Sequence, residues 1–308
     1  MTKNIRSSKS IVICKLPDAG LGNKLFTWAH GVIFAQENNL KHYSVGFAKL
    51  KIGPILRRES SWRFYNNYFK TSKIISRTCF FILHLRNTTV VDYSNCQSKL
   101  DLQNVRVFIF NQIPHWSDYF LNIRESRDLV IKKYFESLTE KNYVRYQSKS
   151  CPIIGIHIRM GDFKKMAECT NFAEVGQTRT PLDYFINIIK ILRAIIGRDL
   201  EVTIFSDGKK SELQKILNLN NVVIAENDSD MLQMLHLSKS KIIVLSAGST
   251  FGQWAAFFSD GAVINHYEHF HSFIRPSEFN KNSYEGVIIP GEKVDKKLLE
   301  YINNKISI

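Results

Sequence analysis

Between residues 153 and 265, short apolar runs alternate with amphipathic stretches, and this alternation restricts the fold more than any other feature of the sequence. The run 153–158 has the composition of a strand that is buried on both faces. The same pattern predicts further strands at 202–205, 222–225, 242–245 and 263–265. Because single helices separate these strands, they are expected to pair in parallel. The sequence therefore predicts an α/β fold with a doubly wound sheet.

Capping residues mark where the intervening helices begin. Thr180 is expected to cap a helix whose first turn contains Pro181. Asp228 or Ser229 is expected to cap a helix that follows the third of these strands. Two more helices are predicted at 211–217 and 249–258.

The N-terminal half opens in the same way, with a strand at 11–15, a glycine-containing turn and a helix at about 23–38. The chain of 308 residues is long enough for two domains of ordinary size or for one large one. If it forms two, they are expected at 1–148 and 149–308, the second ending in a helix at 293–304. The polar stretch 143–152 ends in proline and is the predicted linker. Residues 40–150 show no clear pattern.

The net charge of +14 is concentrated between residues 49 and 86, where basic side chains and aromatic rings alternate and Glu59 is the single acid. Three interpretations are open: a solvated basic face, contact with an anionic membrane surface, or a nucleic-acid groove. No DNA- or RNA-binding signature supports the third, so nucleic acid is not expected as a partner.

Cysteine usage and hydropathy indicate the compartment. The five cysteines are odd in number and form no CxxC pair, which favours reduced thiols over a zinc or redox site. The apolar run 11–16 is short and contains Lys15, and the cluster 79–85 is far below the roughly 20 residues that cross a bilayer. We expect a cytoplasmic protein, peripheral on the inner face of the membrane if the basic region is a membrane contact.

Polar residues follow three of the predicted strands at their carboxyl ends, where ligands gather in a parallel sheet. These groups are 157–162, 206–207 and 246–250. In the first group, Arg159 ends a buried strand, where an uncompensated cation is costly, so it requires a phosphate or a carboxylate partner. Asp162 is a candidate partner. His157 is either a hydrogen-bonded core histidine or a binding residue.

Two glycine-containing turns are candidate anion sites, because each precedes a predicted helix. The turn 19–24 contains Gly20 and Gly22, and these glycines either admit a ligand or only satisfy turn geometry. The turn 246–250 brings hydroxyl groups and amides to a helix N-terminus, where a serine also serves as an N-cap. Asp207 either accepts hydrogen bonds from a ribose or a base edge, or starts a turn with Gly208.

Four segments, in this order along the chain, resemble the inverting α-1,2-fucosyltransferases of bacteria and animals and, more distantly, the α-1,6- and protein O-fucosyltransferases. The family's blocks read Gly-Leu-Gly-Asn-Gln-Leu-Phe, His-x-Arg-Arg-x-Asp, Phe-Ser-Asp and Ser-Asn-Ser-Ser-Phe-Ser-Trp-Trp. The matching segments here are Gly20–Phe26 with Trp28 and Ala29, His157–Phe163, Ile204–Asp207 and Leu245–Phe258. Four ordered blocks are specific, although residues 40–150 match little.

The resemblance implies a GT-B-type glycosyltransferase, with two Rossmann-like domains facing across a cleft, a GDP-sugar held mainly by the C-terminal domain, an acceptor-side N-terminal domain and no metal. It places Arg159 on the β-phosphate. It also places Gly20, Gly22, Asn23, Ser249 and Thr250 around the diphosphate, and His157 and Asp207 at the nucleoside. Inversion requires a base for the acceptor hydroxyl proton, and the candidates are Asp162 and then Glu168.

Departures from the family pattern leave the sugar open. Met160 stands where the family usually has a second arginine, and Lys24 replaces a glutamine. Ala247-Gly248 replaces Asn-Ser, and Gly252-Gln253-Trp254 replaces Ser-Trp-Trp. The leading hypothesis is transfer of fucose or a related sugar to a glycan or lipid-linked oligosaccharide, in the synthesis of a surface polysaccharide such as the O-antigen of lipopolysaccharide. The alternative is a catalytically degenerate glycan-binding protein or a basic nucleic-acid-binding protein.

Overall fold

The computed structural model describes residues 10–47, 65, 68–70, 74, 88–90, 107–117, 119–165, 172 and 176–306. These residues form two compact units: unit 1 ends at Tyr143 and unit 2 begins at Val144. The dividing point lies inside helix α5 (Glu140–Gln147), so much of the predicted linker at 143–152 is helical.

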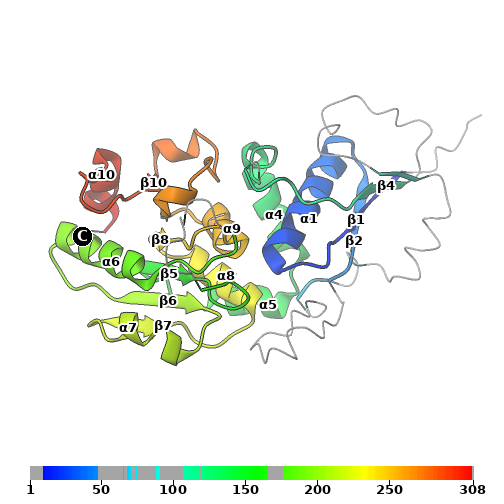
Figure 1. Ribbon diagram of the computed structural model, residues 1–308. Coiled ribbons are helices and arrows are strands. Elements are labelled where there is room, and N and C mark those ends of the chain that lie inside the picture. The colour runs from blue at the N-terminus through cyan, green and yellow to red at the C-terminus, as the bar shows by residue number, and fades with distance from the viewer. Residues whose placement is uncertain are drawn as a thin grey trace, which may run out of the picture. The chain divides into compact units, whose positions relative to one another are not determined.

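Unit 1 is built on a parallel sheet in the order β2-β1-β4-β3 (Figure 1). Its strands are β1 (Ile11–Lys15), β2 (Lys41–Val45), β3 (Thr88–Val90) and β4 (Val107–Phe110). Its helices are α1 (Leu21–Glu37), the 3-10 helix η3 (Arg124–Ser126), α4 (Arg127–Ser137) and the start of α5. The predicted strand at 11–15 is confirmed, and the predicted helix begins two residues early, at Leu21.

Helix α1 covers one face of this sheet. Phe34 and Ala35 pack on Val12 of β1 and on the β4 rings Phe108 and Phe110. Helix α4 lies beside α1, where the rings of Trp28 and Tyr134 meet edge to face with centroids 5.7 Å apart. Burial of these large side chains, each worth about 1.5–3 kcal/mol, is what stabilises unit 1.

Unit 2 is built on six parallel strands in the order β10-β9-β8-β5-β6-β7. The strands are β5 (Ile154–Ile158), β6 (Val202–Ser206), β7 (Val222–Ile224), β8 (Ile242–Val244), β9 (Ala262–Asn265) and β10 (Glu285–Val287). The α-helices are α6 (Leu182–Ile196), α7 (Gln214–Leu217), α8 (Asp230–Ser238), α9 (Thr250–Phe258) and α10 (Lys296–Lys305). Three 3-10 helices complete it: η5 (Lys210–Glu212), η6 (Tyr267–His269) and η7 (Phe279–Lys281). The predicted α/β class, with a doubly wound sheet, is confirmed.

The two faces of the unit 2 sheet carry different helices. Ile154, Ile156 and Ile158 of β5 join a core with α6 and α10. The intervening residues Gly155 and His157 face α8 and α9, since a Cβ atom on Gly155 would collide with the side chain of Ser240. Both faces of β5 are therefore covered, as its apolar composition predicted.

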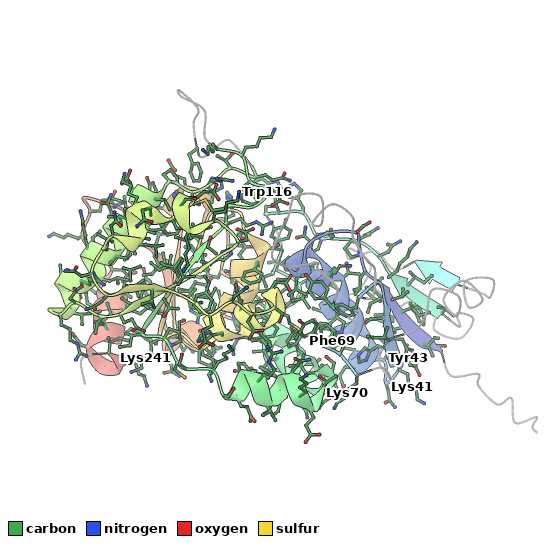
Figure 2. All side chains as sticks on the ribbon, turned by 90° about the horizontal axis from the view of Figure 1, so that it is seen from below. Lys41, Tyr43, Phe69, Lys70, Trp116 and Lys241 are labelled. Atoms are coloured by element: carbon green, nitrogen blue, oxygen red, sulfur yellow. The ribbon has the colours of Figure 1, made fainter. Side chains whose placement is uncertain are left out.

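Helix α10 is tied to the sheet through Lys241, which is labelled in Figure 2. The Tyr301 hydroxyl donates to the Lys241 carbonyl at 2.9 Å, and Lys241 Nζ donates to the Lys305 carbonyl at 3.2 Å. The predicted terminal helix is thereby confirmed as part of unit 2.

Two helix predictions need correction. Pro181, not Thr180, is the N-cap residue of α6, and the Thr180 hydroxyl accepts a hydrogen bond from the Ala247 amide at 3.0 Å instead. The predicted helix at 211–217 is divided into η5 and α7, because Glu212 accepts a hydrogen bond from the Lys209 amide at 3.0 Å and fixes a tight turn. Ser229 does cap α8, by accepting from the Leu232 amide at 3.3 Å.

Candidate functional site

The strand order of unit 2 reverses between β5 and β8, and this is where open α/β sheets bind ligands. The side chain of Ser246, just after β8, joins the two strand ends there. Its hydroxyl accepts a hydrogen bond from the Arg159 amide at 2.9 Å and donates to the His157 carbonyl at 2.9 Å. The predicted groups at 157–162 and 246–250 therefore meet at one point.

Arg159 lies between two carboxylates at this point. Nη1 donates to Asp207 Oδ2 and Nη2 donates to Asp162 Oδ1. The other oxygen of Asp207 accepts from the Met160 amide at 2.8 Å, and the Phe163 ring lies 5.5 Å from the guanidinium carbon. The Arg159 side chain is 20% exposed, so its charge is held in place and still accessible. Because a guanidinium has five N–H donors, an anion can bind beside these carboxylates or replace one of them.

Glycines make this arrangement compact. A Cβ atom on Gly161 would collide with Asp207 Oδ2, and one on Gly208 would lie 2.7 Å from Met160 Cγ. The turns after β5 and β6 therefore interlock. Met160 itself is 5% exposed and belongs to the core, so a second arginine at this position would be buried.

Arg179 supports the same turn and was missed by the sequence analysis. Its Nε donates to the carbonyls of Met160 (3.1 Å) and Phe163 (2.9 Å), and its Nη1 donates to Glu212 at 2.7 Å. The hydrogen bond from the Lys209 amide, together with that from Arg179, holds the pKa of Glu212 below its ordinary value. Arg179 belongs to no helix or strand, and for this reason no periodicity pointed to it.

A cavity of about 470 Å³ opens at the carboxyl ends of β6 and β7. It is lined by Gly161, Arg179, Ile204, Ser206, Asp207, Gly208, Lys209, Lys210, Glu212, Ile224, Ala225, Asn227 and Gln233. This volume is within the usual range for a small-molecule site, and the walls combine apolar side chains with cations and amides. Asp207 connects the cavity with Arg159.

His157 is buried beneath α9. Its ring stacks on Phe251 with centroids 5.0 Å apart, and Gly252 approaches it so closely that a Cβ atom would lie 2.8 Å from Nδ1. Desolvation, and then the charge of Arg159, lower the pKa of His157 from 6.5 to about 3, so the ring is neutral at physiological pH. Nδ1 has no hydrogen-bond partner among the described residues. Contact with the nucleoside stays a prediction for this residue.

The turn before α9 depends on the backbone conformation of Gly248 and not on a side-chain cap. Ser249 is the N-cap residue by position, but its side chain makes no capping hydrogen bond, and Thr250 begins the helix. Gly248 has a φ of +63°, a conformation that other residues adopt at a cost. The amides of the first helical turn therefore point out of the end of α9, close to Ser246 in the chain.

The glycine turn of unit 1 leads directly into α1. Gly20 is the N-cap residue, and Gly22 and Asn23 lie within the first helical turn. Asn23 Oδ1 is buried, and no described residue offers it a hydrogen bond. Lys24 is 1% exposed, and its Nζ donates to the carbonyls of Pro17 and Gly46, both at 2.9 Å. The lysine that replaces the family's glutamine therefore links two backbone segments inside unit 1.

Some predicted features lie outside the described residues, Glu168 and most of the basic region 49–86 among them. Within that region, the rings of Tyr65 and Phe69 are buried in unit 1, and Phe69 packs 4.3 Å from Phe47. These two rings are therefore core residues and not interfacial ones, which corrects that part of the prediction. Lys70, beside Phe69 in Figure 2, is exposed.

Within the part of the chain that the structure describes, no helix has the length and apolarity of a membrane span. In the same residues, no group of three histidine, cysteine or acidic side chains is placed to hold a metal ion. Independence of metal, peripheral membrane contact and a cytoplasmic location stay predictions.

Unit 2 is thus a parallel α/β unit with an accessible arginine between two carboxylates at its switch point and a cavity of about 470 Å³ beside it. The model of Glycosyl transferase family 11 matches residues 65–281. The chain belongs to this family, and the relation to fucosyltransferases indicated by the four motifs is confirmed. No curated protein sequence is significantly similar to the chain.

Similar solved structures include two fucosyltransferases. The NodZ α-1,6-fucosyltransferase soaked with GDP-fucose is 12% identical, with 83% of this chain and 94% of that one covered and a TM-score of 0.48. Another structure of NodZ, from Bradyrhizobium, is 13% identical, with coverages of 83% and 95% and a TM-score of 0.47. POFUT1 in complex with GDP-fucose is 10% identical, with coverages of 92% and 99% and a TM-score of 0.47.

Proposed function

We propose that this protein transfers fucose, or a closely related sugar, from a GDP-sugar to a hydroxyl group of a glycan acceptor, with inversion and without a metal ion. The observation that carries the proposal is the position of Arg159. Its accessible guanidinium lies at the switch point of the sheet, and its partner Asp207 lines a cavity large enough for a nucleotide.

The guanidinium suits the departing group. When the bond between the anomeric carbon and the phosphate oxygen breaks, the bonding electron pair leaves with GDP and negative charge grows on the β-phosphate. A fixed cation stabilises that charge, and removal of one such group typically costs two to three orders of magnitude in rate. We propose that the amides at the start of α9, with Ser249 and Thr250, bind the same diphosphate, because a helix N-terminus favours an anion.

Asp162 is the proposed base. It pairs with Arg159 Nη2, and its side chain is 45% exposed. We propose that a phosphate bound to Nη2 replaces Asp162 there, and that the Asp162 carboxylate then accepts the proton of the attacking hydroxyl. Asp207 is held in addition by the Met160 amide and keeps Arg159 oriented. Glu168 remains the second candidate for the base.

The linkage and the acceptor are proposed from the motifs. Their closest resemblance is to α-1,2-fucosyltransferases, which supports a galactoside acceptor in a surface polysaccharide or lipid-linked intermediate. Met160 and the 246–254 segment depart from the family pattern. The proposal therefore specifies the guanine nucleotide of the donor and leaves its sugar as fucose or a close relative.

Titration calorimetry with GDP, GDP-fucose and UDP-glucose, each with Mg²⁺ and with a chelator, tests the donor. We expect binding of both guanosine nucleotides that is insensitive to the chelator, and transfer to a galactoside acceptor detected by mass spectrometry. Absence of binding at millimolar concentration overturns the donor assignment. Tight binding with no turnover against a broad acceptor panel would instead support a degenerate glycan-binding protein.

A further inference from the structure

A compact group of rings, three from the segment after strand β9 and one from helix α6, lies at the same edge of the sheet as Arg159. This aromatic–imidazole cluster consists of Tyr184, His266, Tyr267 and His269. The His266 ring lies 4.3 Å from the Tyr184 ring and stacks on Tyr267 with centroids 4.9 Å apart and planes 17° from parallel. His269 completes the group at 5.9 Å from His266.

One side of the cluster is buried and hydrogen-bonded, and the other side is exposed to solvent. His266 is 4% exposed and its Nδ1 accepts from the Glu268 amide at 3.3 Å, which caps η6. The Tyr184 hydroxyl donates to the Asn265 carbonyl at 3.1 Å. Tyr267 is 37% exposed, although it stacks on this fixed base. The cluster therefore holds one aromatic ring at the surface with little freedom to move.

The strand order fixes where this ring stands relative to the donor. Along the carboxyl edge, the cavity lies at β7 and β6, Arg159 follows β5, the turn 246–250 follows β8, and the cluster follows β9. Neighbouring strands are about 4.8 Å apart, so the end of β9 is about 10 Å from the end of β5. The guanidinium of Arg159 points toward β6, away from β9, which lengthens this separation.

A donor laid along this edge, with its nucleoside in the cavity and its β-phosphate on Arg159, places its own sugar near β8. One pyranose ring is about 5 Å across, a little more than one strand spacing. The next sugar in line, the one that receives the transferred residue, therefore lies over β9. The polarised C–H groups on one face of a pyranose ring are attracted to the electron-rich face of an aromatic ring.

We propose that the aromatic–imidazole cluster is an acceptor subsite, in which the exposed ring of Tyr267 stacks against a pyranose ring of the glycan acceptor. This inference rests on the proposed function, because it uses the donor to define which sugar lies at β9. It assigns part of acceptor recognition to unit 2.

Steady-state kinetics of three variants tests the subsite. Tyr267→Ala is expected to raise the KM for the acceptor about tenfold, the upper range for one aromatic contact, with a much smaller change in the KM for GDP-fucose. Tyr267→Phe keeps the stacking face and is expected to restore the acceptor KM. Tyr143→Ala removes a tyrosine of similar exposure, 39%, from helix α5 and is expected to change neither KM.

An unchanged acceptor KM in Tyr267→Ala overturns the subsite, and so does an equal rise in both KM values or a matching effect of Tyr143→Ala. A thermal unfolding midpoint close to wild type shows that a KM effect is not a folding defect. If the wild-type protein neither binds GDP-fucose nor transfers sugar, the proposed function itself fails. If the wild type transfers and Tyr267→Ala transfers equally well, the subsite alone is wrong.

Discussion

Each unit has a cation close to the end of its first strand, and the two cations differ in exposure and in the kind of partner they have. Arg159 of unit 2 is 20% exposed and is balanced by Asp162 and Asp207. Lys24 of unit 1 is 1% exposed and donates to two backbone carbonyls. The first can exchange a carboxylate for a ligand, whereas the second is sealed into the fold.

The difference shows that a motif match does not by itself assign a role. Both residues lie in segments that resemble the family's blocks, but only Arg159 has a charge that an incoming anion can reach. Lys24 holds the turn after β1 against the end of β2, which is a structural task.

The largest expected effect separates these two roles. Arg159→Ala should lower the transfer rate by about two to three orders of magnitude, because the charge that stabilises the leaving group is lost. Its unfolding free energy should change by less than about 1 kcal/mol, since the side chain is partly solvated. Initial rates and thermal unfolding measure the two quantities.

Lys24→Met is the matched variant in unit 1. It should destabilise the protein by about 1–3 kcal/mol, because two buried carbonyls lose their donor, while the rate per folded molecule stays close to wild type. A near wild-type rate for Arg159→Ala would remove the phosphate clamp from the mechanism.

An intermediate effect concerns pH and the buried histidines. The pKa of His157 in unit 2 is lowered from 6.5 to about 3, and burial lowers the pKa of His30 in unit 1 to about 3. Below pH 6.5 the unfolded chain binds protons that the folded chain does not, so stability must fall as the pH falls toward 3. Each residue contributes about 1.4 kcal/mol per pH unit, or roughly 2 kcal/mol at pH 5.

Denaturant unfolding at pH 7.5 and pH 5 measures this loss. His157→Gln should flatten the pH dependence of unit 2, and His30→Gln that of unit 1. A full slope in both buried-site variants would show that these rings do not stay neutral in the folded protein.

The smallest expected effect distinguishes the two glycine turns. Gly248 has a φ of +63°, so Gly248→Ala should cost about 1–2 kcal/mol of stability. Gly20 has a φ of −64°, and apart from its two chain neighbours no described residue has an atom within 4 Å of the place of a Cβ atom. Gly20→Ala should therefore change stability by less than about 0.5 kcal/mol.

Activity gives the second readout of this pair. Neither conformation nor packing within the described residues requires glycine at position 20. If Gly20→Ala lowers turnover without a change in stability, the glycine serves close approach of a ligand. If it has no effect on either quantity, the turn of unit 1 is structural, and the contrast between the two turns becomes sharper.

The sequence predicted unit 2 far better than unit 1, and the reason is physical. Strands such as β5 and β8 are buried on both faces and read as continuous apolar runs. Strand β2 is half polar, β3 reads Thr-Thr-Val and β10 reads Glu-Gly-Val, so none of the three forms a continuous apolar run. Thr180 looked like a cap because sequence cannot show that its hydroxyl reaches the Ala247 amide.

The candidate site likewise has residues that the sequence predicted and residues that it could not predict. Arg159, Asp162, Asp207 and the turn 246–250 could be placed at one edge because parallel strands share it. The support from Arg179 and the stacking of Tyr267 depend on tertiary contacts between segments without periodicity, so no local pattern could predict them. The pairing of Arg159 with Asp162 is one of two alternatives that the sequence offers. For Asp207 the sequence offers a contact with the nucleoside or a turn with Gly208, and neither includes its bond to Arg159.

A buried ion pair fixes the segment between β9 and β10 to the first residue of β10. The side chains of Arg275 and Glu285 are fully buried, and Arg275 also donates to the carbonyls of Gly261 and Tyr284. Breaking such a pair by removing one partner exposes an uncompensated charge to the interior, at a typical cost of 3–5 kcal/mol. The segment that carries His266 and Tyr267 is therefore locked into the cooperative folding of unit 2 and does not open as an independent loop. Recognition elements on it are preorganised, and their geometry persists until the whole unit melts.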